Sequence, residues 1–184
     1  MNIELIKNIF SAGAVSYSSK YLTAQIVENI DFENAKVIIE LGSGNGCITK
    51  ELLANISSDC RLISIELNSN FEQYLKSISD HRFIYKIDSA ENLTEILKKL
   101  GIIKVDYIIS SLPFKIIPDK IEENIYNEIK KISTDDLIFI HYSYFHSQKK
   151  KLLKLFQHIK VNFEMMNFPP AFVFICKNTS KSSR

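Results

Sequence analysis

The stretch V-I-I-E-L-G-S-G-N-G, from Val37 to Gly46, decides the fold of this chain. Its β-branched apolar run, which closes on Glu40, is typical of a buried parallel strand, and residues with helical spacing follow the glycines. Gly42 and Gly44 lack a Cβ atom at points where the backbone must turn sharply and pass close to a ligand. A strand, a glycine turn and the free N–H groups of a helix start predict a nucleotide-binding entrance. Such turns also occur in ordinary loops, so the motif alone is weak evidence.

The spacing of the glycines separates two kinds of nucleotide loop. A dinucleotide fingerprint reads G-x-G-x-x-G, whereas this loop reads G-x-G-x-G, and Cys47 stands where the third dinucleotide glycine would fall. NAD is therefore disfavoured. The loop resembles the first motif of the class I S-adenosylmethionine-dependent methyltransferases, in which it wraps the methionine end of the cofactor. The residues concerned here are Glu40, Gly42, Ser43, Gly44 and Gly46.

The composition is that of an ordinary globular protein. The 184 residues, 46% of them hydrophobic and 24% charged, are enough for one domain with a substantial core. The net charge of +2 gives no overall electrostatic case for binding nucleic acid. Cys47, Cys60 and Cys176 have no C-x-x-C pairing and no histidine partners at metal spacing, so we expect a reduced cytosol and no metal site. No apolar run approaches the roughly 20 residues that span a bilayer.

The remainder of the chain alternates between strand and helix patterns. The expected strands cover 37–41, 61–66, 83–87, 105–110, 136–141, 161–168 and 171–176. Helices are expected at 1–11, from Leu22 to Ile30, after the glycine loop, from Leu93 to the stop at Gly101, from Asp119 to Ile132, and from Leu152 to Ile159. The last two strands follow each other so closely that they must be antiparallel neighbours or a hairpin. The pattern predicts an α/β three-layer, Rossmann-like sandwich, with a mostly parallel seven-stranded sheet and one antiparallel edge strand.

Acidic residues follow the second and third expected strands. Glu66 lies 20 residues beyond Gly46, where a carboxylate can accept both ribose hydroxyls of an adenosine, although it could equally be a solvated charge. Asp88 either contacts the adenine amino group, as the resemblance to class I methyltransferases implies, or caps a helix. Leu67 and Ser89 stand beside these acids and, together with Ser111 after the fourth expected strand, complete the expected cofactor contacts.

The fourth expected strand leads into the turn Ser111-Leu112-Pro113-Phe114. A proline directly after a buried strand ends the pairing and fixes the backbone, so this turn can present a carbonyl and an aromatic ring to a cleft. It could equally be a packed turn. Ligands of parallel sheets bind outside the carboxyl ends of the strands, and there we expect the glycine loop, the two acids and this turn to converge.

The whole chain resembles the bacterial phospholipid N-methyltransferases. Besides the glycine loop, the matching pieces are G-A-V-S-Y-S-S at 13–19, I-E-L-N-S-N-F at 65–71, S-S-L-P-F at 110–114 and N-F-P-P-A-F-V at 167–173. The first and last of these are particular to that family, whereas the glycine loop and the acids belong to class I methyltransferases at large. The resemblance implies S-adenosylmethionine as methyl donor, S-adenosylhomocysteine as product, and stepwise methylation of phosphatidylethanolamine toward phosphatidylcholine.

The chain departs from that family at two positions near the expected substrate entrance. Tyr17 stands where the family typically has a proline, and Ser111 where it has a glycine. Aromatic faces suit a product that becomes a quaternary ammonium. No general base is identified, and His141 is better explained as a hydrogen-bonded structural histidine. The candidate substrate contacts are Tyr17, Ser111, the Leu112 carbonyl, Pro113, Phe114 and Tyr142.

A second resemblance is to the rRNA adenine dimethyltransferases, whose fourth motif reads N-L-P-Y or N-L-P-F. There the asparagine and the proline-adjacent carbonyl accept hydrogen bonds from an exocyclic amine, and the ring stacks on the flipped base. Ser111 replaces that asparagine, and the chain ends soon after its last strand, where that family appends an RNA-gripping helical domain. Nucleic acid is therefore the less expected partner. The intact glycine loop and acids argue against a third hypothesis, a catalytically silent S-adenosylmethionine-binding protein.

Residues 1–11 are expected to form an amphipathic helix with one apolar face. That face consists of Ile3, Leu5, Ile6, Ile9 and Phe10. It either packs on the core or covers the cofactor and meets a phospholipid membrane surface. We expect residues 1–30 to form this lid and interface segment, 31–177 the methyltransferase domain and 178–184 a flexible tail. The expected location is the cytoplasm, with peripheral contact at the inner membrane, and the oligomeric state stays open.

Overall fold

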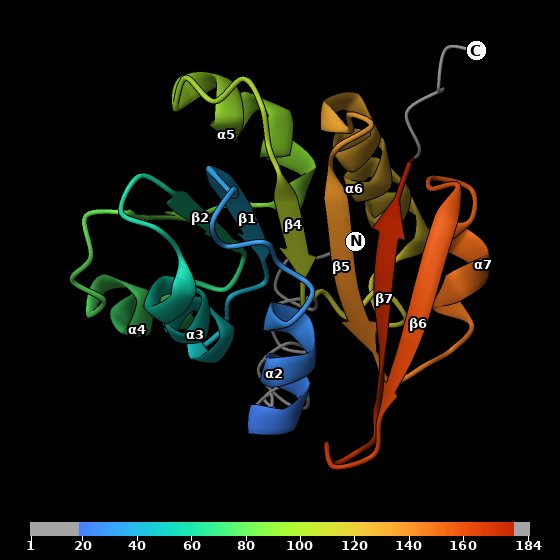
Figure 1. Cartoon of the computed structure of the whole chain (residues 1–184). Helices are drawn as coiled ribbons and strands as arrows, with labels where there is room; N and C mark the ends of the chain where they lie inside the picture. Colours follow the sequence, from blue (N-terminus) through green and yellow to red (C-terminus); the bar gives the residue numbers. More distant parts are fainter. Residues whose placement is uncertain (1–18, 179–184) are drawn as a thin grey trace.

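A seven-stranded sheet with the strand order β3-β2-β1-β4-β5-β7-β6 forms the centre of the fold (Figure 1). The computed structural model describes residues 19–178. The strands are β1 (Val37–Leu41), β2 (Arg61–Glu66), β3 (Phe83–Ile87), β4 (Tyr107–Ser110), β5 (Ile138–Ser143), β6 (His158–Glu164) and β7 (Ala171–Lys177). The first five run parallel, while β7 runs antiparallel to both of its neighbours, β5 and the outermost strand β6. The predicted class I methyltransferase sheet, mostly parallel with one antiparallel strand, is confirmed, and the antiparallel strand β7 lies next to the edge strand β6 instead of at the edge itself.

Helices cover both faces of this sheet (Figure 1). They are α2 (Lys20–Val27), α3 (Cys47–Asn55), α4 (Glu72–Lys76), α5 (Leu93–Lys99), α6 (Asp119–Ile132) and α7 (Gln148–Leu152), with short 3-10 turns η1 (Ser69–Phe71) and η2 (Ala90–Asn92). Ser19 caps the start of α2, where its side chain accepts a hydrogen bond from the Leu22 backbone N–H. Within residues 19–178, no helix is long and apolar enough to cross a bilayer.

Alternate strand residues feed two hydrophobic cores, one on each face of the sheet. The first core joins strand residues such as Ile39, Ile108 and Phe139 to α5, α6 and α7. The second joins Ile38 and Ile140 to α2 and α3. Because central parallel strands are covered on both faces, they read as continuous apolar runs, as the stretch before the glycine loop does.

Helix α2 belongs to the core of the domain and is not a separable segment. Its residues Leu22 and Ile26 are fully buried in the second core. The expected boundary at residue 30 therefore falls inside the domain, because burial of this helix face stabilises the same sheet. The expected helix over 1–11 and the motif from Gly13 to Ser18 lie outside the described residues, as does Tyr17.

The chain between β5 and β7 differs from the expected pattern. Strand β5 begins at Ile138 and continues to Ser143, two residues beyond the expected end. The helix expected from Leu152 to Ile159 is wrong: α7 ends at Leu152, and Ile159 lies on β6 opposite Cys176. Leu152 and Phe156 are buried, as helical spacing suggested, but pairing with β7 imposes the strand conformation from His158 onward.

Candidate active site

The expected site residues meet at the carboxyl ends of β1, β2 and β4, toward the lower edge of Figure 1. Backbone hydrogen bonds continue the sheet ladder into the loops at this edge. The Gly42 N–H donates to the Ile65 carbonyl at 2.8 Å, and the Ser111 N–H donates to the Leu41 carbonyl at 2.9 Å. The Asp88 N–H likewise donates to the Glu66 carbonyl at 2.9 Å. The glycine loop, both acids and the Ser111 turn are therefore brought together, as the sequence predicts.

The glycine loop has backbone angles that favour glycine. Gly42, Gly44 and Gly46 have φ values of 81°, 52° and 79°. A Cβ atom on Gly42 would lie 3.1 Å from Leu112 Cδ2, so the glycine loop packs closely on the Ser111 turn. At Gly44, in contrast, no atom of the described part of the chain lies within 4 Å of the Cβ position. The backbone at Gly44 therefore borders open space where a ligand can approach closely.

Glu66 ties the end of β2 to the glycine loop. Its Oε2 accepts a hydrogen bond from the Gly44 N–H at 2.9 Å, and its Oε1 accepts one from the Asn68 N–H at 2.8 Å. Burial raises the pKa of this carboxyl, although the backbone hydrogen bonds partly oppose that shift. Each carboxylate oxygen can accept a second hydrogen bond, so Glu66 keeps capacity for the ribose hydroxyls that we expect it to bind.

Glu40 is a fully buried carboxyl beneath the loop. Its Oε2 accepts hydrogen bonds from the hydroxyls of Thr49 on α3 at 2.7 Å and of Ser64 on β2 at 2.5 Å. Burial raises the pKa of Glu40 to about 7. Neither Thr49 nor Ser64 was predicted from the sequence as a site residue, although Ser64 stands out as the polar residue within an apolar strand.

Asp88 and Ser89 follow β3 and shape the turn into η2. Asp88 Oδ1 accepts hydrogen bonds from the Ser89 N–H at 2.7 Å and from Asn92 Nδ2 at 2.8 Å. Ser89, and not Asp88, is the N-cap, because its hydroxyl accepts from the Glu91 N–H. The helix-cap alternative for Asp88 is thus taken by its neighbour, and the adenine contact stays a prediction. Leu67, next to Glu66, is partly exposed at the same edge.

The Ser111 turn offers two polar groups to this edge. The Ser111 Oγ atom is buried and has no hydrogen-bond partner among the described residues. The Leu112 carbonyl accepts from the Phe114 N–H at 2.9 Å and retains a second lone pair, so it can still accept from a substrate amine. Pro113, in the middle of the turn, is partly exposed.

Phe114 differs from the expectation that it presents its ring to the substrate. Its side chain is only 2% exposed and lies in the first core, with ring centroids 4.8 Å from Tyr126 and 5.0 Å from His141. The apolar ring gains more from this packing than from facing solvent. Tyr142, at the end of β5, packs instead with the second core, on the face of the sheet that carries Glu40. It remains a candidate substrate contact.

His141 is a structural histidine, which confirms the preferred interpretation. It is fully buried, and its Nδ1 lies 3.1 Å from the Ser110 carbonyl. Because a carbonyl only accepts, Nδ1 carries the proton and Nε2 is left as an acceptor, without a partner among residues 19–178. Burial lowers the pKa of His141 to about 4, so the ring is neutral at physiological pH. Its hydrogen bond to the Ser110 carbonyl holds the backbone directly before the Ser111 turn.

Three buried polar atoms without partners cluster in the glycine loop, the strand before it and the neighbouring turn. Within the described residues, Glu40 Oε1, Ser43 Oγ and Ser111 Oγ accept or donate no hydrogen bond. Leaving one such atom unsatisfied costs about 1–3 kcal/mol, so the cluster indicates that a polar ligand supplies the missing partners. Together with the open space at Gly44, these atoms fit S-adenosylmethionine, whose methionine end carries a cationic amino group that suits the Glu40 carboxylate. The bound cofactor supplies an electrophilic methyl group.

Comparison with known proteins agrees with this geometry. The chain is 27% identical over 182 residues to the ornithine lipid N-methyltransferase of Singulisphaera acidiphila, covering 97% of this chain and 95% of that protein. It is 35% identical over 99 residues to the ribosomal RNA small subunit methyltransferase A of Mycoplasma mycoides, covering 52% of this chain but only 35% of that protein. No protein-family model matches the chain.

Solved structures agree on the fold. The 1,6-didemethyltoxoflavin-N1-methyltransferase of Burkholderia thailandensis, whose structure contains S-adenosylhomocysteine, superposes with a TM-score of 0.67 at 11% identity, covering 96% of this chain and 88% of that one. The fold and the similarity to the Singulisphaera acidiphila enzyme over nearly the whole of both chains together indicate an S-adenosylmethionine-dependent methyltransferase with the class I fold, which confirms the predicted enzyme class and cofactor. Within that class, the lipid N-methyltransferases are the family that fits it, since the similarity to the Singulisphaera acidiphila enzyme extends over nearly the whole of both chains.

Proposed function

We propose that this enzyme transfers methyl groups from S-adenosylmethionine to the amine of a membrane lipid, with phosphatidylethanolamine as the acceptor. The observation that carries the proposal is the similarity over nearly the full length of both chains to an enzyme whose name describes methylation of a lipid amine. The polar groups of the Ser111 turn support it, because a small amine needs only a few acceptors close to the methyl group.

Methyl transfer requires no covalent intermediate with the protein. Methyl transfer from a sulfonium is an in-line displacement, so holding the amine and the methyl group in line is the main contribution of the site. The amine must be neutral when it attacks, and a desolvated pocket favours the neutral form. In this proposal Ser111 Oγ and the Leu112 carbonyl accept its N–H groups, and Tyr142 offers an aromatic face to the methylated product.

A second candidate, methylation of an adenine in ribosomal RNA, rests on one observation. The match to the Mycoplasma mycoides rRNA enzyme spans 99 residues, about half of this chain and a third of that protein. The resemblance to the rRNA enzymes, however, implies an asparagine where this chain has Ser111. A hydroxyl is shorter than an amide and does not offer the same reach to an exocyclic amine.

Parallel reactions with different lipids test the proposed acceptor. The enzyme and radiolabelled S-adenosylmethionine are incubated with vesicles of phosphatidylethanolamine, of ornithine lipid, and of phosphatidylcholine, whose amine is already quaternary. We expect label in the lipid extract of the first reaction and none in the third. Label only with ornithine lipid would show that ornithine lipid, and not phosphatidylethanolamine, is the acceptor. No label with either lipid would refute the proposal.

A further inference from the structure

The turn between β6 and β7, which we call the hairpin tip (Met165 to Pro170), displays large apolar side chains. Met165 is 73% exposed, Met166 65% and Phe168 91%. Scattered apolar residues on a surface need no explanation, but several neighbours at one protruding turn indicate an interaction site. Phe163, at the end of β6, adds a fourth exposed apolar side chain beside them.

The backbone of the hairpin tip is held from inside by buried polar side chains. Asn167 is only 2% exposed; its Oδ1 accepts from the Ser19 N–H at 3.1 Å, and its Nδ2 donates to the Pro169 carbonyl at 2.7 Å. Glu164 Oε1 accepts from the Met166 N–H at 2.7 Å. The polar residues thus point inward and the apolar ones outward, which is the reverse of the arrangement usual for a surface turn. A tip ordered in this way loses little conformational entropy when it binds.

The hairpin tip also carries no exposed charge. From Val161 to Cys176 the sequence contains no Asp, Lys, Arg or His, and its one Glu is Glu164. Glu164 is 8% exposed and hydrogen-bonded within the turn. An uncharged apolar protrusion is suited to the interfacial zone of a bilayer, where Met and Phe side chains leave water without any charge being desolvated.

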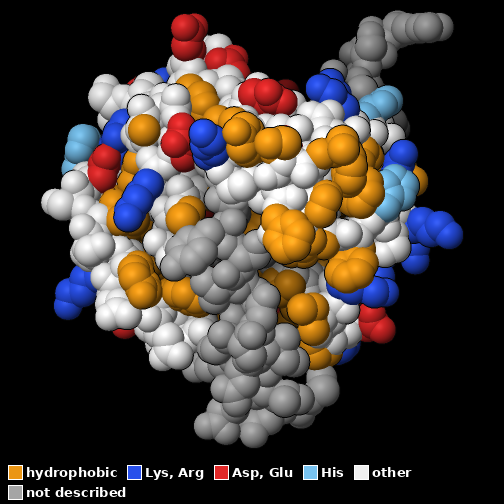
Figure 2. All heavy atoms as spheres, turned by 90° about the horizontal axis from the view of Figure 1, so that it is seen from below, with side chains coloured by type: hydrophobic (Ala, Val, Ile, Leu, Met, Phe, Trp, Pro, Cys, Tyr) orange, Lys and Arg blue, Asp and Glu red, His pale blue; other side chains and the backbone are white. Residues whose placement is uncertain are grey.

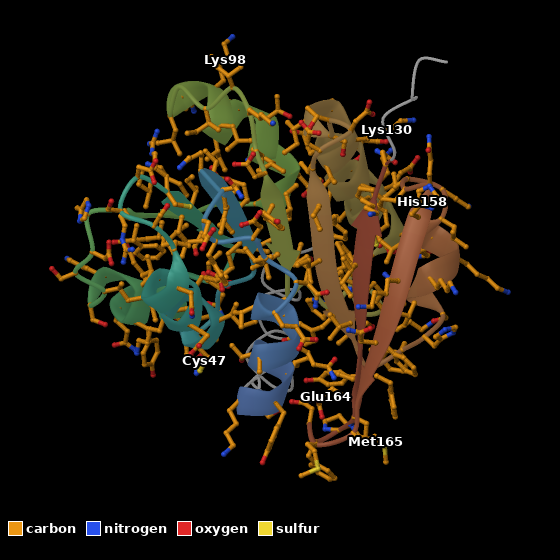
Figure 3. All side chains as sticks on the ribbon, viewed as in Figure 1. Cys47, Lys98, Lys130, His158, Glu164 and Met165 are labelled. Atoms are coloured by element: carbon orange, nitrogen blue, oxygen red, sulfur yellow. The ribbon has the colours of Figure 1, made fainter. Side chains whose placement is uncertain are left out.

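The hairpin tip lies on the side of the molecule to which the candidate active site opens. It extends past the carboxyl ends of β4 and β5 at the lower edge of Figure 1, and Met165 marks its end in Figure 3. Figure 2, which views the molecule from that side, shows hydrophobic side chains gathered over this face. A lipid held at this face by its acyl chains would have its headgroup near the site.

We propose that the hairpin tip inserts into the membrane interface and holds the active site at the level of the lipid amines. This inference rests on the proposed function, since it assumes a membrane lipid as the substrate. A second copy of the chain is a less suitable occupant, because a stable protein interface buries about 800 Å² per partner. The few side chains of one turn offer well below that, whereas a fluid bilayer needs no complementary surface.

The test is flotation with phosphatidylcholine vesicles, without methyl donor, so that binding is measured independently of any acceptor. The double variant Met165→Ser/Met166→Ser is compared with Ile103→Ser, a control at a fully exposed apolar residue that precedes the amino end of β4. Both substitutions are on the surface, and thermal unfolding checks that both variants are folded. We expect the double variant to partition about tenfold less, given the apolar area removed, and the control to bind like the unchanged protein.

Salt separates apolar insertion from electrostatic attraction. The part of binding that the double variant loses should be the same at about 0.1 M and about 1 M salt, because insertion of uncharged side chains is not screened. Equal vesicle binding by the folded double variant and the unchanged protein would overturn the proposal, as would a loss that disappears at high salt. If phosphatidylethanolamine proved not to be methylated while the double variant still lost vesicle binding, the acceptor alone would be wrong.

Discussion

Replacement of Gly44 by alanine tests whether the open space beside the glycine loop is cofactor space. Gly44 has φ of 52°, and the described residues place no atom within 4 Å of its Cβ position. Gly101, at the end of α5, has φ of 67° and equally open surroundings, so Gly101→Ala is a matched control far from the site. The two variants share the backbone penalty, and only Gly44→Ala adds a methyl group to the site.

The shared penalty follows from the left-handed backbone. An alanine in this region costs about 1–2 kcal/mol, and the stiffer unfolded chain offsets about 0.4–1 kcal/mol of it. We expect a net loss of about 1 kcal/mol in the free energy of unfolding for each variant, which lowers the Tm of a domain of this size by about 2–4 °C. The added methyl group at Gly44 should weaken cofactor binding by about 1–3 kcal/mol, as overpacking of a close contact does.

Calorimetric titration with S-adenosylhomocysteine and thermal unfolding measure the two effects separately. We expect similar Tm values for the two variants, roughly fivefold to 150-fold weaker binding for Gly44→Ala, and unchanged affinity for Gly101→Ala. Unchanged affinity of Gly44→Ala would show that the cofactor does not pass the backbone at this position. Equal weakening in both variants would show that the effect is general destabilisation.

Two further predictions concern the buried ionisable groups. Glu66→Gln should weaken S-adenosylhomocysteine binding in calorimetry by about 1.5–3 kcal/mol, because one of the Gly44 and Asn68 N–H groups then faces an amide donor; unchanged affinity would place the ribose elsewhere. The pKa of His141 is lowered to about 4 in the folded state, whereas it is about 6.5 in the unfolded chain. As pH falls between these two values, the unfolded chain binds a proton that the folded protein does not, so the free energy of unfolding falls by about 3 kcal/mol in total. His141→Phe removes this group and should make the free energy of unfolding depend less on pH over that range. Glu40, whose pKa is raised to about 7, acts in the opposite sense, so the free energy of unfolding must be measured with denaturant for the variant and the unchanged protein at each pH. The same dependence of this free energy on pH in both proteins would contradict the prediction.

The parts of the fold that rest on local pattern were predictable. The bounds of β1, β2 and β3 match the expected strands, because continuous β-branched runs between turn signals leave little ambiguity. The chain from Leu152 to Ile159 was not predictable in this way. Its apolar residues have helical spacing, yet the chain from His158 pairs with β7, and such long-range pairing leaves no mark on the periodicity of a short segment.

In the candidate site, too, some features follow from local sequence pattern and others depend on long-range packing. The strand-end rule placed Glu66, Asp88 and the Ser111 turn at one edge, because parallel strands that share a direction end together. The inward orientation of Phe114 was not predictable, because it depends on the space that Tyr126 and His141 leave beside it. The hydrogen bonds of Glu40 likewise come from residues on α3 and β2 that only the folded chain brings together.

The methyl acceptor is tested most directly in one methyl-transfer reaction that contains both a lipid amine and RNA. Phosphatidylethanolamine vesicles and ribosomal RNA are mixed with the enzyme and radiolabelled S-adenosylmethionine, and the lipid extract and the RNA are then counted separately. Methylation of a lipid amine predicts label in the lipid headgroup and none above background in the RNA. Label in the RNA alone would contradict it.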